Sequence, residues 1–283
     1  MAGAEDFMET GGWRRRRNPR NTTSRLVSGW RIQIGVIRAL MTRELITRFG
    51  RENIGFLWVM VEPLLFAGLV GVVWTFMRGS SEHGGISTAA FVATGYIPLT
   101  FFRHAVSRAV GLFSANSSLM YHRQVQVLDF VLVRFLIELI GAMMAFLFIG
   151  ALFHVLGLMP IPVYPGYLLA GFALYSLFTF SLCLILAPLS ERSEVIEKLI
   201  PVTTYIMIPF SGTFTMNSWL APQAQQYMVY SPFVDAMEMI RYGVFGDLVE
   251  PIYDPVVPLV ASMLLMAVGL ALCRQVRRRL IVE

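Results

Sequence analysis

Ionisable side chains interrupt two long apolar stretches of this sequence. Glu62 lies inside the first stretch and is followed by Pro63, while Arg103, His104 and Arg108 interrupt the second. Carboxylate, imidazole and guanidinium groups form charge-assisted hydrogen bonds with one another and with ionic ligands. In a membrane such groups usually face the interior of a helix bundle or a water-filled cavity, where they find partners. Their chemistry therefore favours ion pairing between helices or recognition of a polar molecule.

The Glu62-Pro63 pair predicts a bend in the helix that carries it. Proline leaves the carbonyl four residues earlier without its helix hydrogen bond. At about 1.5 Å per residue, Glu62 lies roughly 12 Å beyond the start of the apolar run. We expect Glu62 to bond a basic or polar group of the second apolar stretch. The alternative is a carboxylate near the lipid headgroups that keeps local water.

The composition indicates that the elements around these groups lie in a membrane. Of the 283 residues, 56% are hydrophobic and 14% are charged, and the mean hydropathy is +0.62. Soluble domains carry about 25% charged residues. The two cysteines, Cys183 and Cys273, lie in separate apolar runs and give neither a disulfide framework nor a metal-binding spacing. We therefore predict an all-α membrane protein without metal-binding or catalytic residues.

Six apolar runs reach or approach the roughly 20 residues that a membrane-spanning helix needs. They are 54–77, 86–112, 130–157, 164–189, 196–212 and 256–273. The fifth run is short and contains Pro201 and Pro209. The expected fold is therefore a domain of six transmembrane helices over residues 54–283.

The basic residues predict the orientation of these helices. With both termini in the cytoplasm, all of the 23 lysine and arginine residues except Arg78 and Arg241 fall on the cytoplasmic side. This bias predicts cytoplasmic N and C termini and an even number of spans. No cleavable signal peptide is visible at the basic N-terminus. Residues 1–28 are expected to form a disordered basic arm that lies on anionic lipid.

Residues 30–49 are too polar to span a membrane but have the period of an amphipathic helix. Apolar side chains recur there at steps of three or four residues. They are Trp30, Ile34, Ile37, Met41, Leu45 and Phe49. We predict a helix within 29–53 that lies at the cytoplasmic interface with its apolar side in lipid. It either only anchors the topology or also docks a partner.

Two cytoplasmic connections carry polar residues that suit a docking surface. A polar break at Asn116 predicts a short helix that carries Tyr121, His122 and Arg123. The second connection, ERSEVIEK at 191–198, is dense in charge. Solvated connectors without a partner are the alternative.

The stretch 213–255 is broken too often to form one span. Trp219, Pro222 and Pro232 interrupt it, and a helical stripe too short to cross a membrane follows Pro232. The stripe consists of Phe233, Ala236, Met237, Ile240 and Val244. A pair of short re-entrant helices on the periplasmic side fits this pattern, because irregular backbone at membrane depth needs protein or water around it. An ordinary external loop is the alternative.

Three motifs resemble those of a known family. The chain resembles the permease subunits of ABC transporters that export capsular polysaccharide in RALMTRELITRFGRENIGFLWVMVEPLLF, FFRHAVSR and SPFVDAMEMIRYGVFG. These are type-2 ABC exporter permeases, whose relatives move O-antigen and teichoic acid. The resemblance covers roughly residues 30–280. It implies export of an anionic, lipid-linked capsular polysaccharide across a bacterial inner membrane; a permease for O-antigen, teichoic acid or another lipid-linked glycan is the alternative.

The resemblance also implies partners. It implies a homodimer, two cytoplasmic ABC ATPase subunits, a co-polymerase-type adaptor in the periplasm and inner membrane, and an outer-membrane export protein, but no nucleic acid. A nucleotide-binding P-loop needs a glycine-rich turn followed by lysine. The only lysine, Lys198, follows SEVIE, which has no glycine. ATP and Mg²⁺ are therefore expected on the partner subunit, with no cofactor on this chain, which we expect to be a transport subunit and not an enzyme.

Polar and aromatic side chains are the candidates for lining a channel. The candidates are Glu62, Arg103, His104, Arg108, Trp219, Tyr227, Tyr230, Arg241 and Tyr242. Arg103 is expected at the cytoplasmic entry, where it would bind an anionic polymer; topological anchoring is the alternative. The aromatic rings, with Phe101 and Phe102, would stack on sugar rings, although Trp and Tyr also gather at membrane interfaces for other reasons.

Charged and polar residues on the cytoplasmic side are the candidates for docking the ATPase. These candidates are Arg43, Glu44, Arg48, Tyr121, His122, Arg123, Glu191 and Glu194. Arg134 and Glu138 lie four residues apart on one predicted helix face, so we expect a structural ion pair at the base of the third span.

Other functions of membrane proteins find no support in the residues. A rhomboid-type serine protease needs a histidine after its serine, but the last histidine, His154, precedes Ser211. A membrane glycosyltransferase needs an Asp-x-Asp type of metal-nucleotide site, which the sequence lacks. Secondary transporters show repeats around broken helices, and no such repeat is visible.

Overall fold

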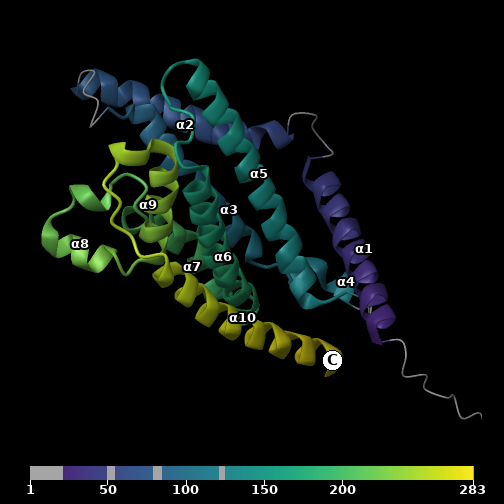
Figure 1. The fold of residues 1–283 in the computed structure, drawn as a ribbon. Coiled ribbons are helices and arrows are strands. Elements are labelled where there is room, and N and C mark those ends of the chain that lie inside the picture. Colours follow the sequence, from purple (N-terminus) through teal and green to yellow (C-terminus); the bar gives the residue numbers. More distant parts are fainter. Residues whose placement is uncertain (1–21, 50–54, 79–84, 121–124, 283) are drawn as a thin grey trace, which may run out of the picture.

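The regular structure of this protein is helical in the residues that the computed structural model describes, which are 22–49, 55–78, 85–120 and 125–282 (Figure 1). The prediction of an all-α fold is therefore confirmed for these ranges. In chain order the α-helices are α1 (Thr22–Phe49), α2 (Gly55–Arg78), α3 (Thr88–Ala109), α4 (Ser117–Met120), α5 (Val127–Val155), α6 (Pro165–Ser190), α7 (Glu194–Ile206), α8 (Pro222–Met228), α9 (Pro232–Phe245) and α10 (Val256–Val282). Short 3-10 turns lie between them at η2 (Ser114–Asn116), η3 (Ile208–Phe210), η4 (Asn217–Trp219) and η5 (Gly246–Leu248).

Among the described residues, three helices are long and apolar enough to cross a membrane. They span Val127–Val155, Pro165–Ser190 and Val256–Val276, and correspond to the third, fourth and sixth predicted runs. The shorter apolar stretch Met60–Trp74 lies within α2. The fifth run forms α7, whose 13 residues extend only about 20 Å. Six complete spans therefore stay a prediction.

Helix α1 lies beside the lower part of α5 at the edge of the bundle (Figure 1). It begins at Thr22, so the end of the segment that we assigned to the basic arm is helical. The predicted apolar stripe divides into two parts. Ile37, Met41 and Leu45 pack against the core, whereas Trp30 and Ile34 are 69% and 58% exposed. The exposed part is the apolar surface that a lipid interface would cover.

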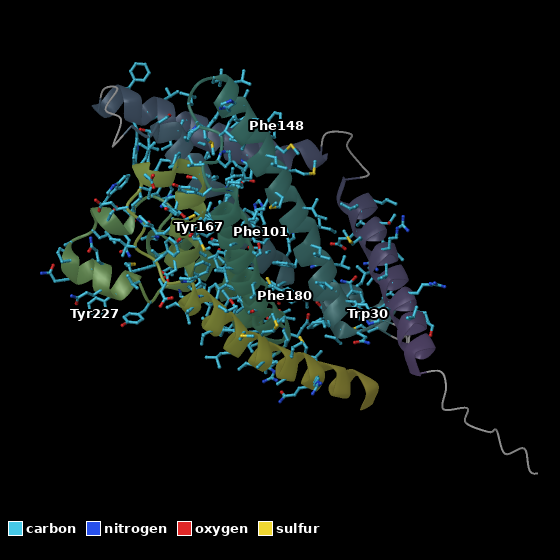
Figure 2. The ribbon with its side chains drawn as sticks, in the orientation of Figure 1. Trp30, Phe101, Phe148, Tyr167, Phe180 and Tyr227 are labelled. Carbon is cyan, nitrogen blue, oxygen red and sulfur yellow. The ribbon has the colours of Figure 1, made fainter. Side chains whose placement is uncertain are left out.

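Helix α3 is buried along most of its length, between α2, α5 and α6. Phe101 packs against Phe135 and Phe172, and Phe102 packs edge-on against Phe233. Figure 2 shows Phe101 in the middle of the bundle. Both rings are buried, at 2% exposed. The prediction that they stack on sugar rings is therefore corrected: these aromatic rings build the core.

Helix α9 packs closely against α6 through glycine. A Cβ added to Gly243 of α9 would lie 2.3 Å from the backbone nitrogen of Leu168 of α6. One added to Gly171 of α6 would lie 2.8 Å from the backbone nitrogen of Ile240. The two backbones can approach this closely only because these positions lack a side chain. The apolar stripe predicted after Pro232 is confirmed as the buried face of α9.

Candidate functional site

A network of charged side chains connects α1, α2, α3 and α5. We call it the interhelical polar network, and its members are Glu44 of α1, Glu62 of α2, His104 and Arg108 of α3, and Arg134 and Glu138 of α5. Ionisable groups among apolar helices are costly unless they have partners. Here each carboxylate lies next to a basic side chain from another helix.

His104 lies between two carboxylates. Its Nε2 is 3.6 Å from Oε2 of Glu62, and its Nδ1 is 3.9 Å from Oε2 of Glu138. Glu62 thus lies beside a polar group of the second apolar stretch, as the sequence led us to expect. The ring therefore faces a carboxylate of α2 and a carboxylate of α5 together.

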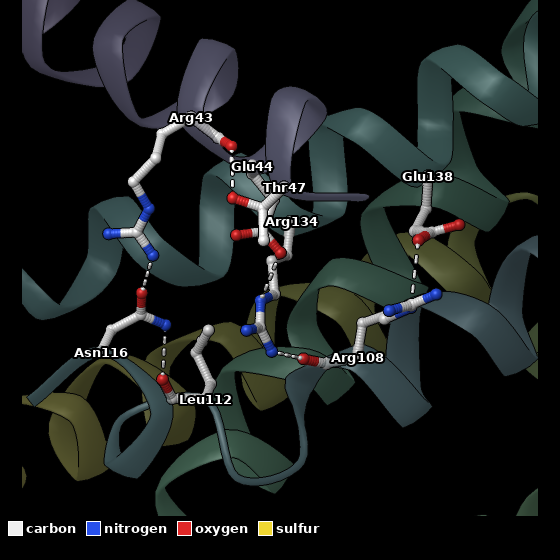
Figure 3. Close-up of polar contacts among 8 residues, drawn as sticks. All are labelled: Arg43, Glu44, Thr47, Arg108, Leu112, Asn116, Arg134 and Glu138. Atoms are coloured by element: carbon white, nitrogen blue, oxygen red, sulfur yellow. Dashed lines mark hydrogen bonds and ion pairs between the residues drawn. The ribbon is translucent and has the colours of Figure 1, made fainter. Parts of the chain in front are cut away.

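Glu138 is the most buried carboxylate of the network, at 3% exposed. Arg108 Nε lies 3.8 Å from Glu138 Oε1 (Figure 3). Because His104 and Arg108 are four residues apart on α3, they project from the same side of that helix toward Glu138. One carboxylate of α5 therefore faces two basic groups of α3.

Arg134 joins α1 and α3 to α5. Its Nε lies 3.2 Å from Oε1 of Glu44, and its Nη1 donates a hydrogen bond of 2.6 Å to the carbonyl of Arg108 (Figure 3). The Arg108 carbonyl lies in the last turn of α3, where carbonyls lack a helical N–H partner and the helix dipole favours a cation. Arg134 and Glu138 share a helix face, as predicted, but each has an ionic partner on another helix.

Further polar contacts hold α1 along its length. Gln33 donates to Asp129 at the start of α5, and Arg43 donates to the side-chain oxygen of Asn116 (Figure 3). Asn116 in turn donates a hydrogen bond of 2.9 Å to the carbonyl of Leu112. A helix held by side chains at several levels is fixed in register and orientation relative to α5.

The connections before α4 and before α7 are bonded to each other. The carboxylate of Glu191 accepts hydrogen bonds of 3.0 Å from the backbone N–H groups of Phe113 and Ser114. Ser190 Oγ accepts a hydrogen bond of 3.2 Å from the N–H of Gly111. The two predicted docking connections therefore form one surface.

The structure places the predicted docking residues unequally. Arg43 and Glu44 bond within the chain, Glu191 organises the loop, and Glu194 is exposed at the start of α7. The side chain of Arg48, and the residues Tyr121, His122 and Arg123, lie outside the part of the chain that the structure describes.

Arg103 links α3 to α7. Its guanidinium carbon lies 4.0 Å from the centre of the Tyr205 ring, a cation–π contact. The side chain is half-buried, between the core and solvent. Arg103 lies on α3, as His104 and Arg108 do, but it is not a member of the interhelical polar network.

The aromatic candidates lie in three different environments. Trp219 packs on Phe91, with ring centres 4.8 Å apart. Tyr227 and Tyr230 are 78% and 76% exposed around α8, and Figure 2 shows Tyr227 at the periphery of the molecule. Tyr242 belongs to a separate group of tyrosines, described next.

The tyrosine group surrounds the start of α6. Tyr242 lies 5.2 Å from both Tyr164 and Tyr167, measured between ring centres. Burial raises the pKa of the Tyr253 phenol, and the phenols of Tyr167 and Tyr242 raise it further. Tyr253 therefore stays protonated at neutral pH and can donate a hydrogen bond.

Arg241 has a different position from the one that we predicted. It was a channel candidate, but its side chain is 0% exposed. Nη1 donates to the carbonyls of Gly212 and Thr215 at 2.7 and 3.0 Å, and Nη2 donates to the carbonyl of Thr213 at 2.5 Å. This prediction is corrected: Arg241 holds the backbone of the 212–215 turn and does not face a channel. The feature of the sequence that could have indicated the buried position of Arg241 is Glu238. It lies one helical turn earlier and supplies a buried counter-charge.

Comparison with known proteins gives a consistent family. Residues 35–245 match the family described as ABC-2 type transporter. The chain is 38% identical over 241 residues to the capsule polysaccharide export inner-membrane protein CtrC of Neisseria meningitidis serogroup B, which covers 85% of this chain and 91% of the relative. It is 38% identical over 244 residues to the capsule polysaccharide export inner-membrane protein BexB of Haemophilus influenzae, covering 86% and 91%.

A more distant relative matches over a similar length. The polysialic acid transport protein KpsM of Escherichia coli is 23% identical over 258 residues, which cover 87% of this chain and 95% of the relative. The family match includes the part of α1 that carries Glu44, as well as α2, α3 and α5, and so contains the whole interhelical polar network. This chain belongs to the ABC-2 type transporter family.

Proposed function

We propose that this chain is the membrane-spanning subunit of an ATP-driven transporter that exports capsular polysaccharide across the bacterial inner membrane. The observation that carries the proposal is the 38% identity to capsule polysaccharide export inner-membrane proteins over most of both chains. A match that covers nine-tenths of each relative includes the whole membrane domain and not one shared motif.

The interhelical polar network offers a way for ATP binding at the cytoplasmic side to move the transmembrane helices. Glu44 and Arg43 lie on α1, next to the connections that we propose to dock the ATPase. Through Arg134 and Glu138 the network extends to His104 and, on the Pro63-containing helix α2, to Glu62. Ion pairs of this kind have discrete partners and can exchange them when helices shift. A displacement of α1 on ATP binding would thus reach α2 and open a path for the polymer.

ATP hydrolysis belongs to a separate subunit in this proposal. The chain has no glycine-rich loop followed by lysine that would hold nucleotide phosphates. We propose that two ATPase subunits with ATP and Mg²⁺ dock on the surface formed by the connections before α4 and α7, near Glu191 and Glu194. Glu191 would keep this surface in shape, because it bonds two backbone N–H groups of the other connection.

The proposed assembly is a homodimer of six-span subunits with cytoplasmic termini. The second and fifth spans would be α3 and α7 with their flanking residues, and 213–255 would form re-entrant helices on the periplasmic side. The buried turn held by Arg241 supports this placement, because irregular backbone at membrane depth needs internal partners. A periplasmic adaptor and an outer-membrane export protein would receive the polymer.

Purification of the chain alone, and together with the ATPase encoded beside it, tests the proposal. We expect ATPase activity only in the presence of the partner, in a complex that holds two copies of each subunit. Activity of the isolated chain, or failure of the two proteins to associate, would contradict the proposed function. Arg103→Ala in the same complex tests the channel entry: unchanged polymer export and unchanged ATPase coupling would remove Arg103 from that role.

A further inference from the structure

An aromatic cavity lies between the end of α2, the start of α3 and the segment 214–219. Its volume is about 380 Å³, within the range of about 300–1,000 Å³ that is typical of small-molecule sites. The lining consists mainly of four aromatic side chains and two threonines, which are Trp74, Phe91, Phe214, Trp219, Thr88 and Thr215. The cavity is far from the interhelical polar network, because Trp74 lies about 18 Å along α2 from Glu62.

Buried contacts hold the walls of the cavity in place. The guanidinium of Arg241 lies 4.0 Å from the centre of the Phe91 ring, and Arg241 also bonds the carbonyl of Thr215. Asn217 N–H donates a hydrogen bond of 3.0 Å to Glu238 Oε1. The segment that carries Thr215 and Trp219 is thus bonded to α9 at Thr215 and at Asn217. The cavity is therefore preformed, which lowers the entropy cost of binding a ligand.

The lining has the chemistry that recognises a sugar ring. The faces of aromatic rings carry negative charge density, which attracts the weakly positive C–H groups on one side of a pyranose. Threonine hydroxyls both donate and accept hydrogen bonds, as sugar hydroxyls do. A site with aromatic walls and only two hydroxyl-bearing side chains distinguishes a sugar from a charged ion, for which this lining offers no counter-charge.

We propose that the aromatic cavity binds a sugar ring of the polysaccharide during export, with Trp219 stacking on the ring and Thr88 and Thr215 bonding its hydroxyls. The inference rests on the proposed function and deepens it by naming a substrate-binding subsite. It places that subsite at the opposite end of α2 and α3 from the interhelical polar network. A lipid acyl chain is the competing occupant, and it would use the aromatic walls but not the hydroxyls.

Thr→Val substitutions separate the two occupants, because valine keeps the shape of threonine and removes its hydroxyl. The assay uses a capsulated Haemophilus influenzae strain that lacks its own inner-membrane capsule export protein and produces this chain with its ATPase. The probe is the capsule polysaccharide of that strain, quantified on the cell surface with serotype antibody. We expect the double variant Thr88→Val/Thr215→Val to lower surface polysaccharide at least about threefold, and Trp219→Ala about tenfold. Trp219→Phe should restore most of the export.

Matched controls exclude general damage. Thr203→Val removes the hydroxyl of an exposed threonine on α7 that bonds only its own helix, and Phe148→Ala removes an exposed ring on α5. Both should export normally. The amount of each variant in the membrane and the ATPase activity of its purified complex should equal those of the unmodified protein.

The outcomes are distinct. Normal export by the double valine variant together with poor export by Trp219→Ala would show an apolar occupant and overturn the sugar proposal. Normal export by all cavity variants would also overturn it. Failure of the unmodified chain to place any polysaccharide on the surface, with its ATPase present, would instead count against the proposed function itself.

Discussion

At the scale of single residues, Glu138 determines how the interhelical polar network is held together. It is buried and lies within ion-pair distance of two basic side chains of α3, whereas Glu62 and Arg108 are a third or more exposed. Removing a buried acceptor leaves its partners without their counter-charge, while exposed ion pairs contribute little. The contribution of the network to stability should therefore be concentrated in Glu138.

We expect Glu138→Gln to lower the free energy of unfolding by about 1–3 kcal/mol. Glutamine keeps the size of the side chain but removes the charge that His104 and Arg108 face. Thermal unfolding of the purified chain in one detergent measures the change. Glu250→Gln is the control, because Glu250 is exposed in the connection before α10. Equal unfolding temperatures for the two variants would mean that the network has no structural role.

The sequence identified several of these residues because charges stand out in apolar runs. Glu62, His104 and Arg108 were found in this way, and the structure brings them together. The pairing of Arg134 with Glu44 could not be predicted, because the two residues lie 90 positions apart and meet only in the folded chain. Phe101 and Arg241 were assigned to a channel because residue type alone does not distinguish a core position from a channel wall.

At the scale of elements, glycine lets α6 and α9 approach more closely than it does any other helix pair in the described residues. Gly243 faces the backbone of Leu168, and Gly171 faces the backbone of Ile240. Backbone atoms cannot move aside as the end of a flexible side chain can. The proposed re-entrant region is thereby fixed to one of the membrane-spanning helices.

Gly243→Ala should lower the free energy of unfolding by at least about 2 kcal/mol, because the new methyl group would overlap α6. Gly166→Ala within α6 is the matched control: nothing lies within 4 Å of its added Cβ. That change should be neutral or stabilise by up to about 1 kcal/mol, since alanine favours a helix over glycine. Thermal unfolding compares the two, and similar stabilities would contradict the close packing.

Helix starts were more predictable than helix roles. Pro165, Pro222 and Pro232 each lie in the first turn of a helix, where the missing N–H costs nothing. The period of the apolar residues after Pro232 predicted the buried face of α9. The length of α7 was not predictable, because its apolar run continues beyond the point at which η3 interrupts the helix.

At the scale of the whole molecule, the orientation in the membrane is the property that the charge bias predicts. The connection before α10 contains Asp254, and the start of α7 contains Lys198, so the two lie on opposite sides if the predicted topology holds. Both native cysteines, Cys183 and Cys273, are buried and give little background in a thiol-labelling experiment.

An impermeant maleimide applied to intact spheroplasts should label Asp254→Cys but not Lys198→Cys. Labelling of Lys198→Cys should appear after the membrane is permeabilised, because the positive residues keep that side in the cytoplasm. The unmodified chain is the control for the buried cysteines. Labelling of Lys198→Cys in intact spheroplasts would reverse the predicted orientation.

The interhelical polar network also has a consequence for the stage of biogenesis at which α3 inserts stably. A charged residue inside a membrane helix raises the free energy of insertion unless it finds a partner. When α3 leaves the ribosome, Glu62 has already been synthesised, but Glu138 of α5 has not. Arg108 therefore lacks its partner Glu138 until α5 has been synthesised. With α3 as the proposed second span, we expect its stable insertion to be completed only when α2, α3 and α5 assemble beside the translocon.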